Sequence, residues 1–270
     1  MEQPFPVAIV KGAGDLGTGV AYRLYRAGFR VLCLDLPKPL AIRRAVAFAS
    51  AIYDARITVE GTQGERIIYA DEAVYTWQRH CIPVLADPDG RSLIVYHPAI
   101  LVDAVMAKHN TGTHITDAPV VVALGPGFTA GADCHAVVET QRGHYLGHVL
   151  FSGSATSDTG IPGRLDGSEA QRVIRAPCAG TIYGRKAIGD VVRQGDVIAQ
   201  VDNTVVRAPL DGVLRGLLHD GVQVSEGMKI GDIDPRAKVD FCYSISDKAL
   251  AVAGGVLEAV FTLRERWYEH

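Results

Sequence analysis

The sequence has 270 residues, which is enough for one large domain or two modest ones. Apolar residues make up 48% and the formal net charge is −3, so a real core is expected without a basic surface for nucleic acid or a disordered acidic tail. The longest apolar runs are too short to span a membrane. No secretory signal is expected, and five scattered cysteines without a CxxC pair favour a reducing, cytoplasmic setting.

The first elements predict a strand, a glycine turn, a helix and a second strand. Val7–Val10 is an apolar run typical of a buried parallel strand, and Val31–Leu34 is a second strand that ends at Asp35. Between them, glycines in GxGxxG spacing open a helix whose backbone N–H groups can cradle a phosphate, while the acid can bind ribose hydroxyls. The pattern predicts a nucleotide or similar phosphate-bearing ligand, and the alternative is a Rossmann-like scaffold with an empty turn. The residues of this first candidate site are Lys11, Gly12, Gly14, Asp15, Gly17 and Asp35.

Four charged residues near this turn have alternative interpretations. Lys11 adds positive charge near a phosphate, whereas Asp15 repels a phosphate unless it caps the helix or holds a metal or ligand hydroxyl. Arg43 and Arg44 lie on a helix expected at Leu40–Ser50. They form either a solvated helix face or an anion clamp.

Strand-like and helix-like segments continue to alternate through the middle of the chain. This rhythm predicts a mostly parallel sheet covered by helices. Helices are expected at Asp71–His80 and Ile100–His109, and strands at Ile82–Leu85, Leu93–Tyr96 and Val120–Leu124.

A second candidate site follows the predicted strand Val120–Leu124, because ligands bind at the carboxyl ends of strands in α/β sheets. Two β-like runs, His135–Thr140 and Tyr145–Phe151, predict a hairpin rich in titratable groups. Anion binding by Arg142 and His144 is favoured over a metal site, for which the spacing is not diagnostic, and a polar, solvated hairpin stays open. The residues of this second candidate site are Gly125, Gly127, Asp133, His135, Glu139, Arg142, Gly143 and His144.

Cys134 lies between two of these titratable residues. A thiol there could handle sulfur or selenium, but a neighbouring carboxylate raises the pKa of a thiol, so ordinary packing is the favoured interpretation.

An internal repeat follows. Val173–Thr204 aligns without gaps on Val205–Arg236, with a period of 32 and shared glycines at turn positions. The repeat predicts a small pseudo-twofold barrel-sandwich, and phrases such as "RAPCAG" and "GDVVRQGDVIA" resemble the biotinyl/lipoyl carrier fold. A carrier of that family has a lysine at the junction of its halves, but Gln200–Thr204 has none. A structural or lid role is therefore favoured over a swinging arm.

The predicted fold class is α/β, with a Rossmann-like mostly parallel sheet domain and a small all-β barrel-sandwich domain. A C-terminal helix, capped by Ser246, is expected to pack back on the first domain. The expected boundaries are 1–152 for the Rossmann-like cofactor-binding domain, 153–172 for a linker or site loop, 173–236 for the repeat module and 237–270 for the C-terminal helix.

Several phrases together resemble one family: "KGAGDLGTGVAYRLYRAGF", "KPLAIRRAVAF", "ALGPGFTAGADCHAVVETQRGHYLG", "TGIPG" and "AVAGGVLEA". The chain is similar to YqeB-type accessory proteins of selenium-dependent molybdenum hydroxylases, and "HAVVETQRGHYLG" also resembles XdhC-type chaperones. The matching positions are the candidate residues named above, except Asp35.

The resemblance implies a cytoplasmic maturation protein for a molybdenum hydroxylase, with the apo-hydroxylase as its partner. The implied cofactor is the molybdenum cofactor or its cytidine dinucleotide form, with phosphates on the first glycine turn. Two alternatives stay open: an NAD(P)-dependent oxidoreductase that binds NAD(P), and a non-enzymatic scaffold or carrier. Whether the protein is an enzyme and whether it forms a homo-oligomer are open at this point.

Overall fold

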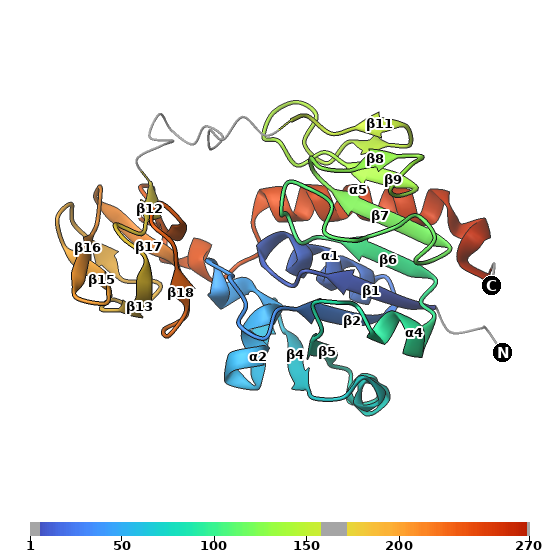
Figure 1. The fold of residues 1–270 in the computed structure, drawn as a ribbon, viewed down its shortest axis with the longest axis horizontal. Coiled ribbons are helices and arrows are strands. Elements are labelled where there is room, and N and C mark those ends of the chain that lie inside the picture. Colours follow the sequence, from blue (N-terminus) through green and yellow to red (C-terminus); the bar gives the residue numbers. More distant parts are fainter. Residues whose placement is uncertain (1–5, 158–171, 269–270) are drawn as a thin grey trace.

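The computed structural model describes residues 6–157 and 172–268. Figure 1 shows a large sheet flanked by helices and, at one end of the molecule, a separate group of short strands. The large sheet has nine strands in the order β10-β9-β7-β6-β1-β2-β5-β4-β3. These strands are β1 (Val7–Lys11), β2 (Arg30–Asp35), β3 (Arg56–Val59), β4 (Thr62–Ile67), β5 (Ile82–Ala86), β6 (Ile100–Asp103), β7 (Val120–Leu124), β9 (Ala136–Val138) and β10 (Val149–Leu150).

The nine-stranded sheet is mixed. Its inner neighbours are parallel, but β3 pairs with β4 and β10 pairs with β9 in the antiparallel direction. Two more short strands, β8 (Thr129–Ala130) and β11 (Gly153–Ser154), pair with each other beside the sheet.

Helices cover both faces of this sheet. On one face, Ala8 and Val10 of β1 pack with residues of the two long helices, and on the other Val7 and Ile9 pack with residues of the shorter ones. This alternation follows from the period-2 geometry of a strand that is buried on both faces. The helices are α1 (Asp15–Arg26), α2 (Ala51–Asp54), α3 (Ala73–Gln78), α4 (Ser92–Tyr96) and α5 (Asp247–Thr262), and the 3-10 turns are η1 (Arg44–Val46), η2 (Phe48–Ser50), η3 (Ala70–Glu72), η4 (Val239–Cys242) and η5 (Arg264–Tyr268).

The two long helices start at the same end of the sheet. A Cβ added at Gly19, the fifth residue of α1, would lie 2.9 Å from the carbonyl oxygen of Ala249, the third residue of α5. Ser246 caps α5 by accepting a hydrogen bond from the Ala249 N–H, as predicted. The N-terminal ends of both helices, where unpaired N–H groups carry partial positive charge, are thus brought together.

The repeat forms two four-stranded antiparallel sheets, ordered β12-β19-β17-β14 and β16-β15-β13-β18. Each strand of the first copy has a counterpart about 32 residues later, and each sheet takes two strands from each copy. The strands are β12 (Val173–Arg175), β13 (Gly180–Gly184), β14 (Val191–Val192), β15 (Val197–Val201), β16 (Thr204–Arg207), β17 (Gly212–Leu217), β18 (Gln223–Val224) and β19 (Lys229–Asp234). We call residues 172–236 the β module.

The predicted fold class is corrected by this topology. The large sheet is mixed because antiparallel pairs form both of its edges, and the β module consists of two antiparallel sheets, so the chain is not clearly a Rossmann-like domain with a biotinyl/lipoyl-type barrel-sandwich. The domain boundaries predicted from the sequence stay predictions.

Three element predictions are wrong, whereas the other expected strands and the helix near residues 71–80 are present. Leu93–Tyr96 belongs to a short helix instead of a strand, and Ile100 starts a strand instead of a helix. Leu40–Ser50, expected as a helix, contains two 3-10 turns. The predicted hairpin loop between β9 and β10 is also longer than expected, because it runs from Glu139 to His148.

Candidate functional site

The first glycine turn connects β1 to α1 and is tightly packed. Gly12 has a φ of +92°, and a Cβ there would lie 2.7 Å from the backbone of Ala104. A Cβ at Gly17 would lie 1.8 Å from the Gly12 carbonyl oxygen, so only glycine allows the helix to start this close to the turn. At Gly14, by contrast, an added Cβ would meet no atom within 4 Å.

Asp35 holds this turn from the end of β2. Its carboxylate accepts hydrogen bonds from the N–H groups of Ala13, at 2.8 Å, and Leu36, at 2.7 Å. Burial raises the pKa of Asp35, and the two hydrogen bonds partly oppose that effect. The acid predicted to bind ribose hydroxyls therefore has a bond to the protein's own turn. Lys11, the last residue of β1, accepts a hydrogen bond from the Ala104 N–H at 2.7 Å through its carbonyl oxygen.

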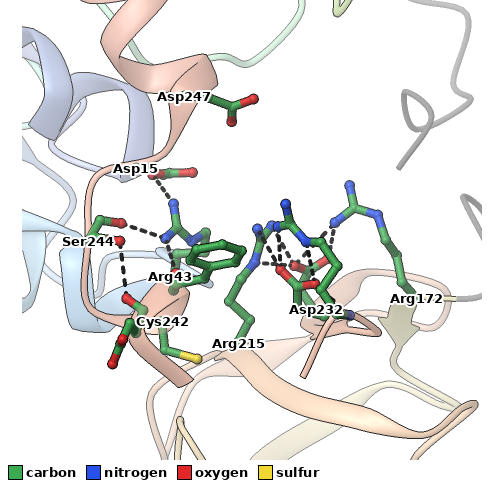
Figure 2. Close-up of polar contacts among 12 residues, drawn as sticks. Asp15, Arg43, Arg172, Arg215, Asp232, Cys242, Ser244 and Asp247 are labelled. Carbon is green, nitrogen blue, oxygen red and sulfur yellow. Dashed lines mark hydrogen bonds and ion pairs between the residues drawn. The ribbon is translucent and has the colours of Figure 1, made fainter. Parts of the chain in front are cut away.

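Asp15 and Arg43 form a partly buried ion pair at the start of α1. The Arg43 Nη1 lies 2.7 Å from the Asp15 Oδ1, and its Nη2 donates to the carbonyl oxygens of Phe241 and Ser244, both at 2.9 Å. Figure 2 shows these bonds converging on the Arg43 guanidinium. Asp15 is therefore neutralised by a protein cation, and Arg43 connects α1 to the segment that leads into α5.

Arg44 contributes to a backbone contact with the β module. Its Nε donates to the Leu217 carbonyl oxygen at 3.0 Å, and the Leu217 N–H donates to the Ile42 carbonyl oxygen at 2.9 Å. A Cβ at Gly216 would lie 2.9 Å from that same Ile42 oxygen. The chain around Arg44 thus docks against β17. Neither arginine is on a solvated helix face, and both are bonded within the protein.

The β module places further cations near the start of α1. Arg172 and Arg215 lie on either side of the buried Asp232 carboxylate, with Arg172 Nη1 and Arg215 Nε at 3.0 and 2.9 Å from it (Figure 2). Lys229 Nζ is 3.9 Å from the same carboxylate. Asp15 influences the pKa of Lys229, which shows that the module's cations and the start of α1 lie within electrostatic reach of each other.

The start of α5 completes this group of charges. Arg142, from the second candidate site, donates two hydrogen bonds to Asp247, the first residue of α5, at 3.0 and 3.1 Å. Lys248 follows, and Arg142, Asp15 and Glu139 all influence its pKa. The structure thus brings together residues from both predicted sites and from the β module.

We call Arg43, Arg142, Arg172, Arg215, Lys229 and Lys248 the cationic cluster. Arg236, which shares the buried Asp234 with Arg215, is also included. Five carboxylates lie among these seven cations, namely Asp15, Glu139, Asp232, Asp234 and Asp247, so the formal positive charges exceed the negative charges by two.

Three members of the cationic cluster have a lowered pKa. Burial is the main cause for Arg172, Lys229 and Lys248, and neighbouring cations lower each value further. Lys248 forms no hydrogen bond or ion pair through its side chain within the part of the chain that the structure describes. Arg172 is buried and Lys248 is partly buried, whereas the Lys229 side chain is 42% exposed. An anion stabilises such mutually repelling cations, and two helix N-termini add to the same field.

Glu139 has a mainly structural role in the cluster. Burial raises the pKa of its carboxyl, but hydrogen bonds from the N–H groups of Gln141 and Thr156, both 2.7 Å long, outweigh burial, so the pKa is lowered. Glu139 is therefore a fixed negative charge that holds the loop carrying Arg142.

The remaining residues of the second candidate site do not join the cluster. His135 precedes β9, at the opposite end of that strand from Glu139, and its Nδ1 accepts a hydrogen bond from the Val121 N–H at 2.9 Å. Asp133 accepts from the Thr129 N–H at 2.7 Å within its own turn. The exposed His144 packs its ring edge-on against Tyr145.

Three glycines of the second candidate site serve backbone geometry. Gly125 and Gly127 have φ values of +71° and +103°, and a Cβ at Gly127 would lie 2.7 Å from the His109 backbone. Gly143, with φ at +136°, lies in the exposed loop beside Arg142. These residues shape the loops without contributing a functional group.

The cations of the β module were not among the residues predicted from the sequence. Arg215 and Lys229 occupy the second copy at positions where the first copy has Tyr183 and Val197. Asp232 likewise replaces Gln200. Charged residues in only one copy of a repeat are a signal that could have pointed to this site. Lys248 and Asp247 had no such signal.

Residues 6–157 and 172–268 contain no group of three or more His, Cys, Asp or Glu side chains arranged to hold a metal ion. None of the helices in these ranges has the length and apolarity needed to cross a membrane.

Comparisons with known proteins give one clear sequence relative. The chain is 50% identical over 257 residues to the uncharacterized protein YqeB of Escherichia coli K12, an alignment that covers 95% of this chain. The chain spans 48% of the length of that relative. This similarity confirms the resemblance to YqeB-type proteins over the aligned half, and no protein-family model matches the chain.

Solved structures give only remote matches. An aspartoacylase family protein from Mesorhizobium loti is 11% identical, with 86% of this chain and 85% of that chain covered and a TM-score of 0.27. A succinylglutamate desuccinylase/aspartoacylase from Rhodobacter sphaeroides is 14% identical, with 85% of each chain covered and a TM-score of 0.26.

These comparisons correct the predicted function and the fold class on which it depended. The matching solved structures are aspartoacylase-type and desuccinylase-type proteins, and the sequence relative is uncharacterized, so neither comparison supports the predicted maturation of a molybdenum hydroxylase, and that prediction is withdrawn. Its two alternatives, an NAD(P)-dependent oxidoreductase and a carrier, are withdrawn with it. At TM-scores below 0.5, the structural likeness assigns no hydrolase activity to this chain.

Proposed function

We propose that the chain binds a small phosphate-bearing ligand at the cationic cluster. The observation that carries the proposal is the excess of positive charge that the fold gathers beside the N-terminal ends of α1 and α5. The lowered pKa values of Arg172, Lys229 and Lys248 agree with it. Holding an excess of like charge in one partly buried region is costly, and a bound anion lowers that cost.

The chemistry of the cluster favours phosphate over a single carboxylate. Two formal positive charges are in excess, and a phosphate monoester carries a charge near −2 at neutral pH. A guanidinium group can donate two parallel hydrogen bonds to two oxygens of one phosphate. The N-terminal ends of helices add backbone N–H donors. The start of α1 fits this role because its N-cap residue, Gly14, has no side chain and an added Cβ there would meet no atom within 4 Å.

The ligands expected from the sequence belong to this chemical class. The molybdenum cofactor, its cytidine dinucleotide form and NAD(P) all carry phosphate groups. Inorganic phosphate, pyrophosphate and NAD⁺ are therefore suitable probes, because they separate recognition of the phosphate from recognition of the attached group.

Titration calorimetry at low ionic strength tests the proposal. We expect saturable binding of pyrophosphate that weakens as salt is added, since salt screens the attraction. Lys248→Gln and Arg142→Gln should each weaken binding by about tenfold or more, because a hydrogen bond to a charged group contributes about 1.5–3 kcal/mol. Arg26→Gln is the matched control, since Arg26 is exposed and lies in the last turn of α1, at the opposite end from the cluster.

A variant can lose binding because it has lost its fold, so the stability of each variant is measured as well. Thermal unfolding of each variant shows whether the loss of binding reflects loss of structure. No heat with any of the three probes, or equal binding by Lys248→Gln and the wild type, would contradict the proposal.

A further inference from the structure

A cavity of about 540 Å³ lies between the β3–β4 hairpin and α3, and the cationic cluster contributes no residue to it. Its walls come from two elements that are adjacent in space. Arg56, Glu65, Arg66 and Ile68 belong to the hairpin and the residue after it, and Tyr75 and Arg79 belong to α3 and its C-terminal end. The volume lies within the range typical of small-molecule sites.

Three arginines line the cavity, and the Glu65 carboxylate forms ion pairs with two of them. Glu65 Oε1 lies 2.7 Å from Arg79 Nη2, and Glu65 Oε2 lies 3.6 Å from Arg56 Nη2. The Glu65 side chain is 16% exposed, whereas those of Arg56 and Arg79 are 64% and 51% exposed. Glu65 therefore fixes the two guanidinium groups at the rim and offsets part of their charge.

The other carboxylate of the cavity is engaged elsewhere. Glu72 Oε2 accepts the N–H groups of Ile68 and Tyr69 at 2.7 and 3.2 Å, and these bonds lower its pKa. Arg66 donates only to a neutral acceptor, the Ile52 carbonyl oxygen at 2.9 Å, and forms no ion pair with any residue in the described ranges. One positive charge is thus in excess, and Arg66 carries it.

The cavity also has an apolar, aromatic wall. Tyr75 and Ile68 are 63% and 61% exposed, although both are large side chains beside a concave surface. A pocket lined by both an aromatic ring and a guanidinium is suited to a planar ligand, because the ring can stack on the ligand while the guanidinium pairs with its anionic group.

We propose that this cavity binds a small aromatic carboxylate. The carboxylate pairs with Arg66, and the ring packs against Tyr75 and Ile68. A carboxylate matches the single excess charge of this cavity, just as a phosphate matches the double excess of the cationic cluster. The two sites therefore select different anions, and the second stands independently of the first.

Ligand-observed saturation-transfer NMR tests this inference, with 4-hydroxybenzoate as the probe and cyclohexanecarboxylate and adenosine monophosphate as comparisons. We expect saturable transfer to the ring protons of 4-hydroxybenzoate, with weaker binding of the non-aromatic acid. Preferential binding of adenosine monophosphate, or no saturable signal from 4-hydroxybenzoate, would overturn the proposal.

Substitutions show whether 4-hydroxybenzoate binds in this cavity. Arg66→Gln and Tyr75→Ala should each weaken 4-hydroxybenzoate binding by fivefold or more. Arg91→Gln and Tyr145→Ala are matched controls, because both residues are exposed and lie outside the cavity. Tyr75 is largely exposed, so its variant keeps the test valid if Arg66→Gln disturbs the hairpin.

Lys248→Gln should leave the binding of 4-hydroxybenzoate unchanged, which separates the outcome from that of the phosphate site. Equal effects of the cavity variants and their controls would refute the assignment.

Discussion

Arg43 and Asp15 are 28 residues apart in the sequence, yet their side chains meet at 2.7 Å at the start of α1. The same guanidinium binds the carbonyl oxygens of Phe241 and Ser244, which lie in the segment between the β module and α5. One buried side chain thus connects three parts of the chain at the edge of the cationic cluster.

Replacing this arginine should therefore destabilise the whole fold. Arg43→Met leaves Asp15 without its cation and two carbonyl groups without their donor. We expect a loss of roughly 3 kcal/mol in the free energy of unfolding, the lower end for broken buried ion pairs, because Asp15 is partly exposed. Urea denaturation measures it. The exposed Arg26→Met should change stability by no more than about 0.5 kcal/mol, and equal losses in the two variants would contradict this role.

The pair of Arg142 and Asp247 should be visible in the pH dependence of stability. The hydrogen bonds from Arg142 are the main cause that lowers the pKa of Asp247 from 3.8 to about 2. A carboxyl group whose pKa is depressed in the folded state contributes stability above its unfolded pKa and loses that stability as the pH falls through the folded value.

The wild type should accordingly be more stable than Asp247→Asn at neutral pH, and the difference should shrink between about pH 4 and pH 2. Denaturation midpoints across this range provide the measurement. Asp89→Asn is the control, since Asp89 belongs to an exposed ion pair, and its difference from the wild type should be small throughout. A constant difference between the wild type and Asp247→Asn from pH 7 to pH 2 would be inconsistent with the interpretation.

The glycine turn allows a test of close packing with a built-in control. Gly17→Ala places a methyl group 1.8 Å from the Gly12 carbonyl oxygen, whereas Gly14→Ala meets nothing within 4 Å. Gly17→Ala should lower stability by at least about 1–3 kcal/mol, the usual range for overpacking, because the obstacle is backbone. Gly14→Ala should have a much smaller effect on thermal unfolding. Similar melting temperatures for the two variants would show that the turn can relax.

Cys134 is expected to be unreactive. Burial, followed by the nearby Asp133, raises the pKa of its thiol to about 12. Since the thiolate is the reacting form, iodoacetamide at neutral pH should modify the partly exposed Cys178 first and Cys134 no faster than Cys81. Peptide mass spectrometry after timed quenching measures this order, and in urea the differences should largely disappear. Preferential labelling of Cys134 in the native protein would revive a chemical role.

The sequence predicted best where a pattern is local. The strand–turn–helix unit beginning at Val7, the cap at Ser246 and the 32-residue period all depend on neighbouring residues or on direct repetition. The strand Ile100–Asp103 was predicted as a helix. A strand that is buried on both faces does not alternate apolar and polar residues, so its apolar run cannot be distinguished from a buried helix. Periodicity also could not show that both edges of the large sheet are antiparallel.

The site was predicted only in part, for a related reason. The glycine turn and Arg142 could be identified because their sequence context is distinctive. The partners that give them their electrostatic setting, Arg215 and Lys248, lie far along the chain, and only folding brings them close. The pairing of Arg43 with Asp15 likewise turned an expected surface charge into a buried connection.

The exchange of strands between the two copies of the repeat has a consequence for synthesis on the ribosome. β12, the first strand of the β module, pairs with β19, which begins 56 residues later at Lys229, so β12 stays unpaired until β19 has been synthesised. Neither copy can complete a sheet alone, so the β module is expected to assemble only after nearly all of both copies has left the exit tunnel. A chain released before Asp234 would expose unpaired strand edges and invite aggregation.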